Sequence, residues 1–534
     1  MLTKDKMFEK GDQARTWQKY CGFLDLSLGE FMEIQEELLM DQIDLVHDSP
    51  LAKKFMPRKP KDVSEFRRLV PLTTYDDYAA YLNEKNEDVL AVKAYSWVRT
   101  SGRGGTPKWV PYTQRAIEKF SMLCIALMIL ACTTRKGEIN IRRGLRVLQN
   151  LPPPPYLTGI MSPLLAQELD ARVIPPLDKY QDADFETRIR AGFQIALRTG
   201  VDMLSSLTSV LVKMGERFSE SSGQLKFSRQ MLHPQIMLRL IQAWLKAKRE
   251  GRALLPKDLW ALKGLAAYGT DTSIYRKQLI HYWGKEPLET YAATETGLMA
   301  THAWNKRSMT FVPSSCFFEF VPKDEWLKSR DDKNYQPSTI LLDEVKPGER
   351  YEIIITSFYG MPFLRYRIGD LIKVIALGDE EAGIKLPQMV FDSRADDLID
   401  IAGFTRFDEK TIWQAIANTG VKYEDWSARK EYEQQDKPIL HLYIELKEET
   451  ESKVLEESIQ QELAAIDQDC RDLRGMLGIR PLRVTLLPAG SFQRYYEERK
   501  RGGADLAHLK PPHMNASDTI IRDLLSLKHA RGSL

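Results

Sequence analysis

Apolar side chains recur at helical spacing over several long segments of the chain. In the first of these segments, Phe31, Ile34 and Leu38 follow one another at three- and four-residue steps, and this period predicts an amphipathic helix. The expected long helices cover residues 27–46, 113–132, 185–218 and 229–250. The proline run at 152–155 lies outside them, because proline lacks the N–H that a helix interior requires.

From about residue 340 the pattern changes to strands. Residues 351–357 are rich in β-branched side chains and lie between Gly348 and Gly360, which predicts a strand. Further strands are expected at 371–375, 389–391, 440–446 and 482–487, and further helices near 408–418, 455–466 and 517–528. Alternating helices and strands of these lengths predict an α/β fold. The change of pattern divides the chain into a large domain, residues 1–396, and a smaller α/β domain, residues 397–534.

Size and composition narrow the class of protein. A chain of 534 residues exceeds what one hydrophobic core supports, so two or three domains are expected from its length. The 76 basic and 74 acidic residues leave a net charge of +2, so we expect no binding to nucleic acid or to an anionic membrane. The longest apolar run, Met122–Cys132, has eleven residues, whereas a membrane span needs about 20.

The N-terminus and the cysteines indicate the cellular compartment of the protein. The first ten residues mix acidic and basic side chains and lack the apolar segment of a secretory signal. The five cysteines are scattered, with no Cys-x-x-Cys pair, which favours reduced thiols over zinc ligands or disulfides. We therefore expect a cytoplasmic protein.

A glycine-rich segment follows an expected strand at 95–101. Its glycines are Gly102, Gly104 and Gly105. Such a turn lets successive backbone N–H groups surround an anion. The side chains available to that anion are the hydroxyls of Thr100, Ser101 and Thr106 and the ammonium of Lys108. The segment is not a Walker loop, because Pro107 precedes the lysine and no Gly-Lys-Ser/Thr follows. Taken alone, it is equally compatible with a surface hairpin turn.

Residues 100–108 resemble the Thr-Ser-Gly-x-x-Gly-x-Pro-Lys phosphate loop of the adenylate-forming superfamily, which includes acyl-CoA synthetases, luciferases and peptide-synthetase adenylation domains. The resemblance implies that this loop binds the pyrophosphate of ATP. It departs from the pattern at Arg103 and Gly104, where small hydroxyl residues are usual.

Residues 291–297 resemble the aromatic-x-x-Thr-Glu element of the same superfamily. The resemblance implies that Tyr291 contacts adenine and that Thr294 bonds the α-phosphate. Glu295 would be the catalytic ligand of Mg²⁺, a cation that prefers one or two carboxylates together with phosphates and waters.

Two more elements follow in the expected order. Tyr366–Asp370 resembles the Tyr-x-x-Gly-Asp element, in which the aspartate accepts from both ribose hydroxyls; the alternative is a strand-end turn. Residues 394–397 resemble the hinge element, so that Arg394 would contact ribose or phosphate and Asp396 would be the pivot of a mobile C-terminal domain. For Arg394 a structural salt bridge is the competing interpretation.

The last element, residues 502–512, resembles the C-terminal lysine motif. The resemblance implies that Lys510 bridges the substrate carboxylate and the α-phosphate, where it would stabilise developing charge. Taken alone, a lysine before two prolines is a surface residue.

The resemblance narrows to the Gretchen Hagen (auxin-responsive promoter) family of acyl-acid amido synthetases, and it extends from about residue 27 to residue 515. The segments that carry it are Val70–Asp77, Leu259-Trp260, Cys316–Phe320 and Ala489–Phe492, with Gly502–Ala504 and Lys510. Departures are the Leu364-Arg365 pair and Pro512-His513, where the family has Pro-Arg.

This family implies ATP-dependent activation of a small carboxylic acid as an acyl-adenylate, followed by acyl transfer to an amine such as an amino acid. Two alternatives stay open: transfer to the thiol of coenzyme A, and a non-catalytic adenylate-binding protein. The apolar segments around 123–130 and 156–164 suggest a hydrophobic acid.

Overall fold

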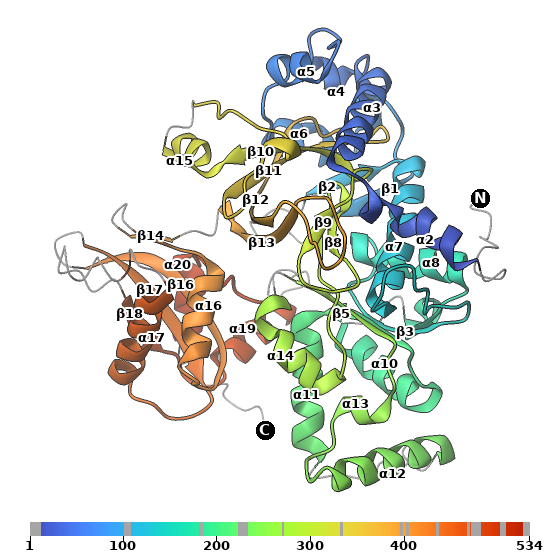
Figure 1. Cartoon of the computed structure of the whole chain (residues 1–534). Coiled ribbons are helices and arrows are strands. Elements are labelled where there is room, and N and C mark those ends of the chain that lie inside the picture. Colours follow the sequence, from blue (N-terminus) through green and yellow to red (C-terminus); the bar gives the residue numbers. More distant parts are fainter. Residues whose placement is uncertain are drawn as a thin grey trace. The chain divides into compact units, whose positions relative to one another are not determined.

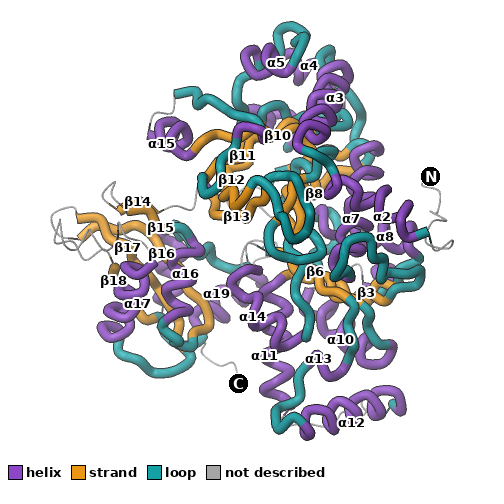
Figure 2. The backbone as a smooth tube through the Cα atoms, in the orientation of Figure 1, coloured by secondary structure: helices purple, strands orange, loops and turns teal. Residues whose placement is uncertain are grey.

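The structure, a computed structural model, describes part of the chain. The described residues are 12–100, 108–180, 183, 185–222, 233–269, 272–331, 335–395, 399–401, 405–433, 437–466, 470, 482–501 and 509–526. They form two compact units, a larger one that reaches residue 391 and a smaller one that begins at residue 392 and includes residues 369–371. The α/β prediction, with a large N-terminal and a smaller C-terminal part, is confirmed (Figures 1 and 2). The boundary at residue 396 lies outside the described residues and stays a prediction.

The larger unit begins with helices. They are α2 (Gln13–Cys21), α3 (Leu28–Val46), α4 (Pro50–Phe55), α5 (Val63–Leu69) and α6 (Asp76–Leu82). Helix α3 starts with a capping box: the Ser27 hydroxyl accepts from the Glu30 N–H at 3.3 Å and the Glu30 carboxylate accepts from the Ser27 N–H at 2.8 Å, so two otherwise unpaired N–H groups are satisfied. The helix expected at 27–46 is confirmed.

A β-hairpin and a parallel sheet follow. Strands β1 (Ser96–Arg99) and β2 (Trp109–Tyr112) pair antiparallel, and α7 (Gln114–Cys132) comes next. The parallel sheet has the order β4-β3-β5-β6. Its strands are β3 (Arg146–Asn150), β4 (Arg172–Ile174), β5 (Met203–Leu207) and β6 (Gly264–Tyr268). The helices of this region are α8 (Leu157–Leu169), α9 (Leu177–Tyr180), α10 (Phe185–Thr199), α11 (Thr208–Ser222), α12 (Pro234–Arg249), α13 (Pro256–Leu259) and α14 (Thr272–Trp283).

One sequence prediction is wrong here. The single helix expected at 185–218 is two helices, α10 and α11, separated by the buried strand β5. Gly200 ends α10 with a φ of +82°, a left-handed conformation that glycine adopts without steric cost. Strands of the parallel sheet also precede residue 340, where the sequence indicated helices and irregular segments.

A seven-stranded sheet completes the larger unit, with the order β10-β11-β12-β13-β9-β8-β7. Its strands are β7 (Thr290–Ala293), β8 (Gly297–His302), β9 (Met309–Phe311), β10 (Cys316–Pro322), β11 (Arg350–Ser357), β12 (Tyr366–Ala376) and β13 (Gln388–Arg394). Helix α15 (Lys323–Asp331) follows β10. The sheet brings the motif of β7 and the motif that opens β12 into one layer.

The smaller unit is a three-stranded sheet with helices. Its elements are β14 (Ile399–Ile401), β15 (Thr405–Phe407), α16 (Glu409–Asn418), β16 (Tyr423–Glu433), β17 (Lys437–Leu446), α17 (Ser452–Ile466), β18 (Leu482–Leu486), α19 (Ser491–Arg501) and α20 (Asp518–Leu525). Strand β17 pairs antiparallel with β16 and parallel with β18. Helices α16 and α17 pack together, while α19 and α20 form an apolar cluster with Tyr443. Because side chains alternate along a strand, Leu442 and Ile444 of β17 point to the opposite face.

Candidate active site

The glycine-rich segment joins the two strands of the β1–β2 hairpin. Thr100 and Lys108 close it: the Thr100 N–H donates to the Lys108 carbonyl at 2.9 Å, and the Lys108 N–H donates to the Thr100 hydroxyl at 3.2 Å. The strand expected at 95–101 is thus present as β1. The intervening residues, Ser101, Gly102, Arg103, Gly104, Gly105, Thr106 and Pro107, lie outside the described residues.

Three motifs that are far apart in the sequence meet beside this hairpin. The Lys108 ammonium lies 3.5 Å from the Tyr366 hydroxyl, and that hydroxyl donates to Oε1 of Glu295 at 3.1 Å. Lys108 also lies over the ring of Tyr75, 5.2 Å from its centroid. Lys108, Tyr75, Glu295 and Tyr366 are hereafter the Lys108 cluster. It places a cation, a carboxylate and two phenols within one part of the larger unit.

The Val70–Asp77 segment explains how Tyr75 and Tyr366 reach each other. Its Thr73 extends the edge of β12, because the Thr73 N–H donates to the Arg365 carbonyl and the Arg367 N–H donates to the Thr73 carbonyl. The Tyr75 hydroxyl accepts from the Trp109 N–H at 2.8 Å, which fixes the start of β2 beside Lys108. The segment therefore connects the hairpin to the Tyr366 motif.

The Leu364-Arg365 departure from the family pattern has a structural explanation. Arg365 is buried, and its guanidinium makes a bidentate pair with Glu319 at 2.8 and 2.9 Å. The same guanidinium donates to the Val70 carbonyl at 2.7 Å. Arg365 itself has a φ of +43°. The pair joins Arg365 to the Cys316–Phe320 strand. Because Tyr366 follows Arg365 directly, the pair helps to hold Tyr366 in its place in the Lys108 cluster.

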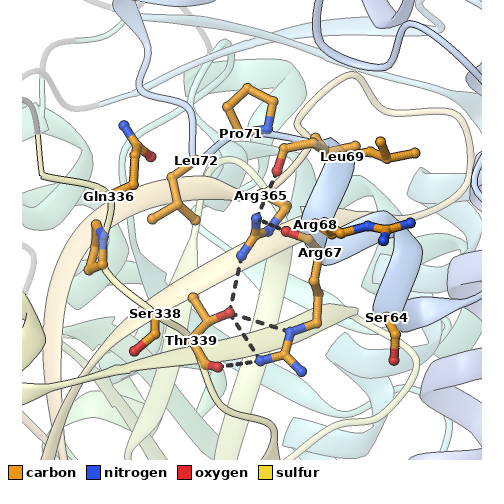
Figure 3. A pocket seen from close by; sticks show the side chains of 12 residues that line it. Ser64, Arg67, Arg68, Leu69, Pro71, Leu72, Gln336, Ser338, Thr339 and Arg365 are labelled. Carbon is orange, nitrogen blue, oxygen red and sulfur yellow. Dashed lines mark hydrogen bonds between the residues drawn. The ribbon is translucent and has the colours of Figure 1, made fainter.

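A pocket of about 580 Å³ adjoins this pair (Figure 3). Among its lining residues are Arg67, Arg68, Thr339 and Arg365. The Arg67 and Arg365 guanidinium groups both turn toward the Thr339 hydroxyl (Figure 3), and both lie within ion-pair distance of Glu319. Glu319 and backbone carbonyls already pair with the two guanidinium groups. We therefore interpret the pocket as a structural feature and not as a ligand site. Glu295 and Tyr366 do not line it.

Burial and the nearby Glu295 carboxylate determine the protonation of the two phenols. The Glu295 side chain is 7% exposed. Burial, followed by the Glu295 charge, raises the pKa of Tyr366 far above its usual range. Burial also raises the pKa of Tyr75 to about 12, with a smaller contribution from Glu295. Both phenols are therefore protonated at neutral pH, and the Tyr366 hydroxyl can donate to the carboxylate.

The other residues of the β7 motif lie close by. Tyr291 is buried in β7, with its ring 6.0 Å from that of Phe391. The Thr294 carbonyl accepts from the Tyr112 hydroxyl at 2.8 Å, and the Glu295 carbonyl accepts from the Ser357 hydroxyl at 3.1 Å. These bonds fix the turn that carries the Glu295 carboxylate. No contact tests the adenine role of Tyr291 or the phosphate role of Thr294, and both stay predictions.

Asp370 and Arg394 form an ion pair with 3.3 Å between Oδ1 and Nη1. Asp370 is buried and Arg394 is half-buried. A paired aspartate and arginine fit a ribose site, and they also fit the structural salt bridge left open by the sequence. Asp396, the expected hinge residue, lies outside the described residues.

Lys510 belongs to the smaller unit. Its side chain is 69% exposed, and its ammonium lies 3.6 Å from Oδ2 of Asp425. Because the ammonium itself is exposed and the distance is long, the pair holds the lysine weakly. The residue is thus accessible to solvent, as a lysine that acts on a separately bound substrate must be.

Sequence reasoning did not assign the hydroxyls of Tyr75, Tyr112 and Tyr366 to the site. Each is an aromatic residue next to or inside a recognised motif, but its partner is remote in sequence; Tyr366 and Glu295 are 71 residues apart. The spacing of a motif carries no signal for such a contact.

The described residues contain no group of three or more His, Cys, Asp or Glu side chains arranged to hold a metal ion. A magnesium–nucleotide site does not require one, since phosphates and waters supply most ligands. Within the same residues, no helix is long and apolar enough to cross a membrane.

Comparisons with known proteins agree with the order of the motifs. Residues 23–147 match the GH3 family N-terminal domain, residues 309–394 the GH3 family central domain and residues 409–519 the GH3 family C-terminal domain. The chain is 22% identical to a putative indole-3-acetic acid-amido synthetase, GH3.9 of Arabidopsis thaliana, over 92% of this chain and 93% of that protein. It is 25% identical to jasmonoyl–L-amino acid synthetase GH3.5 of Oryza sativa subsp. japonica, over 47% of this chain and 45% of that protein.

A solved structure shares the fold. The acyl acid amido synthetase AtGH3.15, in complex with 2,4-DB, superposes with a TM-score of 0.69 over 98% of this chain and 97% of that chain, at 18% identity. Three consecutive family domains in the family's order, a relative aligned over nearly its full length and a common fold all agree with the resemblance seen in the motifs. The chain belongs to the GH3 family.

Proposed function

We propose that the protein is an ATP-dependent acyl-acid amido synthetase, which activates a carboxylic acid as an acyl-adenylate and transfers the acyl group to an amine such as an amino acid. The observation that carries the proposal is the Lys108 cluster. Within a GH3 family fold, it joins the end of the phosphate-loop hairpin to the carboxylate of the Thr-Glu motif through Tyr366.

In the first half-reaction, a substrate carboxylate oxygen attacks the α-phosphorus of ATP. A new O–P bond forms, and the bond from that phosphorus to the pyrophosphate oxygen breaks. Lys108 would hold the pyrophosphate together with the residues that the motif implies, Thr100, Ser101, Gly102, Gly104, Gly105 and Thr106, because a cation and backbone N–H donors suit a multiply charged anion. Lys510 would steady the charge that develops on the α-phosphate.

Nucleotide recognition falls to the other motif residues. Tyr291 would contact adenine, Thr294 would donate to the α-phosphate and Asp370 would accept from the ribose hydroxyls, as an acceptor-only carboxylate does. Arg394, paired with Asp370, would orient that carboxylate or contact the ribose. Asp396 would be the pivot on which the smaller unit turns between the two half-reactions.

The donor set near Lys108 fits Mg²⁺. Glu295 supplies one buried carboxylate, and Tyr366 engages only one of its oxygens, which suits a cation that takes few protein ligands when phosphates are present. When bound, the ion would neutralise charge on the leaving pyrophosphate. The protein's part is to hold the Glu295 carboxylate in place through Tyr366.

In the second half-reaction, the amine nitrogen attacks the acyl carbonyl, AMP leaves, and the amine releases a proton to solvent. The mixed anhydride is already activated, so this step needs mainly orientation. We favour an amino acid over coenzyme A as acceptor because the chain belongs to the GH3 family and aligns over almost all its length with a putative amido synthetase.

The acid is proposed to be hydrophobic. Helix α7 and the start of α8, which contain the apolar segments 123–130 and 156–164, pack against each other, and Arg99 at the end of β1 forms a bridge with Tyr156. Tyr156, at the start of the second segment, thus lies next to the hairpin that carries the phosphate loop, which supports the proposal.

Acid-dependent ATP–pyrophosphate exchange tests the first half. Purified protein is assayed with Mg²⁺, labelled pyrophosphate and a panel that includes benzoate, phenylacetate, indole-3-acetate, octanoate, lactate and malonate. We expect exchange with an aromatic or long-chain acid. Exchange only with lactate or malonate would reject the hydrophobic acid, and no exchange with any member would favour the non-catalytic alternative. With the best acid, a screen of the twenty amino acids against coenzyme A then decides the acceptor: amide product supports the proposal, and thioester alone contradicts it.

A further inference from the structure

The chain just after Lys510 carries a histidine with two carboxylate partners. Nδ1 of His513 lies 2.6 Å from Oε1 of Glu409, and Nε2 lies 2.7 Å from Oδ1 of Asp425. A neutral imidazole has one N–H and an ionised carboxylate has none, so both contacts can be hydrogen bonds to ionised carboxylates only if the ring is protonated. The geometry therefore makes His513 an imidazolium.

Two tryptophans enclose the charged ring. His513 stacks on Trp426 with centroids 4.4 Å apart and planes 9° apart, and it meets Trp413 edge-on at 5.0 Å. Indole faces attract cations. Burial opposes the charge, but Asp425 and Glu409 outweigh burial and raise the pKa of His513 to about 9. The ring thus stays charged at neutral pH, facing Glu409 of α16 and Asp425 of β16.

Backbone hydrogen bonds attach the same segment to β16. The Ala428 N–H donates to the His513 carbonyl at 2.6 Å, and the Asn515 N–H donates to the Ala428 carbonyl at 2.8 Å. The Ser427 hydroxyl donates to the Pro512 carbonyl at 2.7 Å. The two residues between Lys510 and His513 are prolines, which restrict the backbone. The backbone of Lys510 is therefore held close to the sheet.

Asp425 is shared between the two cations. Its Oδ1 accepts from His513, while its Oδ2 lies 3.6 Å from the Lys510 ammonium. With His513 charged, Asp425 already has a close partner, and Lys510 stays 69% exposed. A neutral residue in place of His513 would leave Lys510 as the cation nearest to that carboxylate, and the lysine would be drawn toward it.

We propose that His513 is a positioning residue for Lys510: it anchors the segment after the lysine to β16 and α16 and takes up one oxygen of Asp425, so that the ammonium stays exposed to solvent. The inference rests on the proposed adenylation role of Lys510. It also accounts for a departure from the family pattern, since His513 stands where arginine is usual, and both side chains are cations able to bridge two carboxylates.

The test compares His513→Gln, His513→Arg and the control His441→Gln. His441 bonds Glu431 at 2.6 Å and Thr485 at 2.7 Å in the same unit, so its replacement removes a comparable histidine–carboxylate contact without touching Lys510. Each variant is assayed for acid-dependent exchange with the best acid of the panel and for amide formation from synthetic acyl-adenylate of that acid. We expect His513→Gln to lower the exchange rate about 10- to 100-fold, with amide formation from the adenylate unchanged. His513→Arg should restore exchange and His441→Gln should behave as wild type.

A readout independent of turnover separates failure of this inference from failure of the proposed function. Lys510 is labelled with limiting acetic anhydride, and its rate is compared by mass spectrometry with that of Lys422, whose side chain is equally exposed. His513→Gln should slow labelling of Lys510 relative to Lys422, and His513→Arg should restore it. Unchanged Lys510 labelling, normal exchange in His513→Gln, or equal losses in His513→Gln and His441→Gln would overturn the inference. Wild-type protein without exchange would overturn the proposed function while the labelling result still decides the role of His513.

Discussion

Replacing Tyr366 by phenylalanine removes one hydroxyl from the centre of the Lys108 cluster. The ring is 1% exposed and packs against Phe363 and Tyr78, so the phenylalanine keeps the apolar contacts. What is lost is the hydrogen bond to Glu295 at 3.1 Å and the contact with Lys108 at 3.5 Å. The change thus isolates the link between the two motifs.

The size of the effect follows from the charge on Glu295. A hydrogen bond to a charged group contributes about 1.5–3 kcal/mol. If that free energy holds the carboxylate in its reactive position, its loss slows adenylation by about 10- to 150-fold, at about 1.4 kcal/mol for each factor of ten. Because the pKa of Tyr366 lies far above its usual range, the loss should be the same from pH 6 to pH 9.

The assay is acid-dependent pyrophosphate exchange at saturating ATP, repeated over a range of Mg²⁺ concentrations. Tyr366→Phe should lower the maximal rate and raise the Mg²⁺ concentration that gives half of it. Tyr78→Phe is the matched control, because its buried hydroxyl bonds Thr73 and the Leu364 backbone but not Glu295. Wild-type rate and Mg²⁺ dependence in a folded Tyr366→Phe protein would refute the reasoning, as would an equal shift in Tyr78→Phe.

Three further predictions concern a single residue each. Lys510→Ala should abolish exchange far more than amide formation from preformed adenylate; equal loss in both assays would contradict its role. Arg365→Met leaves the Glu319 carboxylate, which is 1% exposed, without its bidentate partner. The free energy of unfolding measured in urea should therefore fall by about 3–5 kcal/mol, and the double variant Glu319→Gln/Arg365→Met should recover most of it. A loss under about 1 kcal/mol would count against the buried pair. Burial, with help from Arg276 and Lys306, lowers the pKa of His302 to about 3, so the folded state resists a proton that the unfolded state takes up below about pH 6.5. As the pH is lowered from about 6.5 to 3, this residue should therefore reduce the unfolding free energy by up to about 1.4 kcal/mol per pH unit. His302→Gln should flatten that slope. Equal slopes in the variant and the wild type would contradict the assignment.

Elements with a long, unbroken period could be predicted from the sequence. Helices α3 and α7 lie where Phe31, Ile34 and the apolar run after Met122 place them. Strand β5 was missed because its five residues, Met-Leu-Ser-Ser-Leu, are too few and show no alternation of apolar and polar side chains, so periodicity cannot separate them from the flanking helices. Gly200 was the available signal, since a left-handed glycine after a helical run marks the helix end.

In the candidate site, the motif residues could be predicted from the sequence and their contact partners could not. Motif order singled out Lys108, Glu295 and Asp370, because residue types at fixed local spacing are visible in one sequence. The structure brings Lys108 and Glu295 together through Tyr366, and the nucleotide role of Asp370 stays a prediction. The partners of those residues were not visible: the Tyr366–Glu295 bond and the Arg365–Glu319 pair each join segments tens of residues apart. The two carboxylates of His513 lie 88 and 104 residues before it, so the sequence showed only an exchanged residue type after Lys510.

The central claim is that a carboxylate is activated at the Lys108 cluster. The most direct measurement is acid- and Mg²⁺-dependent ATP–pyrophosphate exchange in wild-type protein and in Glu295→Gln, which removes the charge of the buried carboxylate and keeps its shape. We expect exchange in the wild type and its near-complete loss in the folded variant. Exchange that persists at the wild-type rate in Glu295→Gln would contradict it.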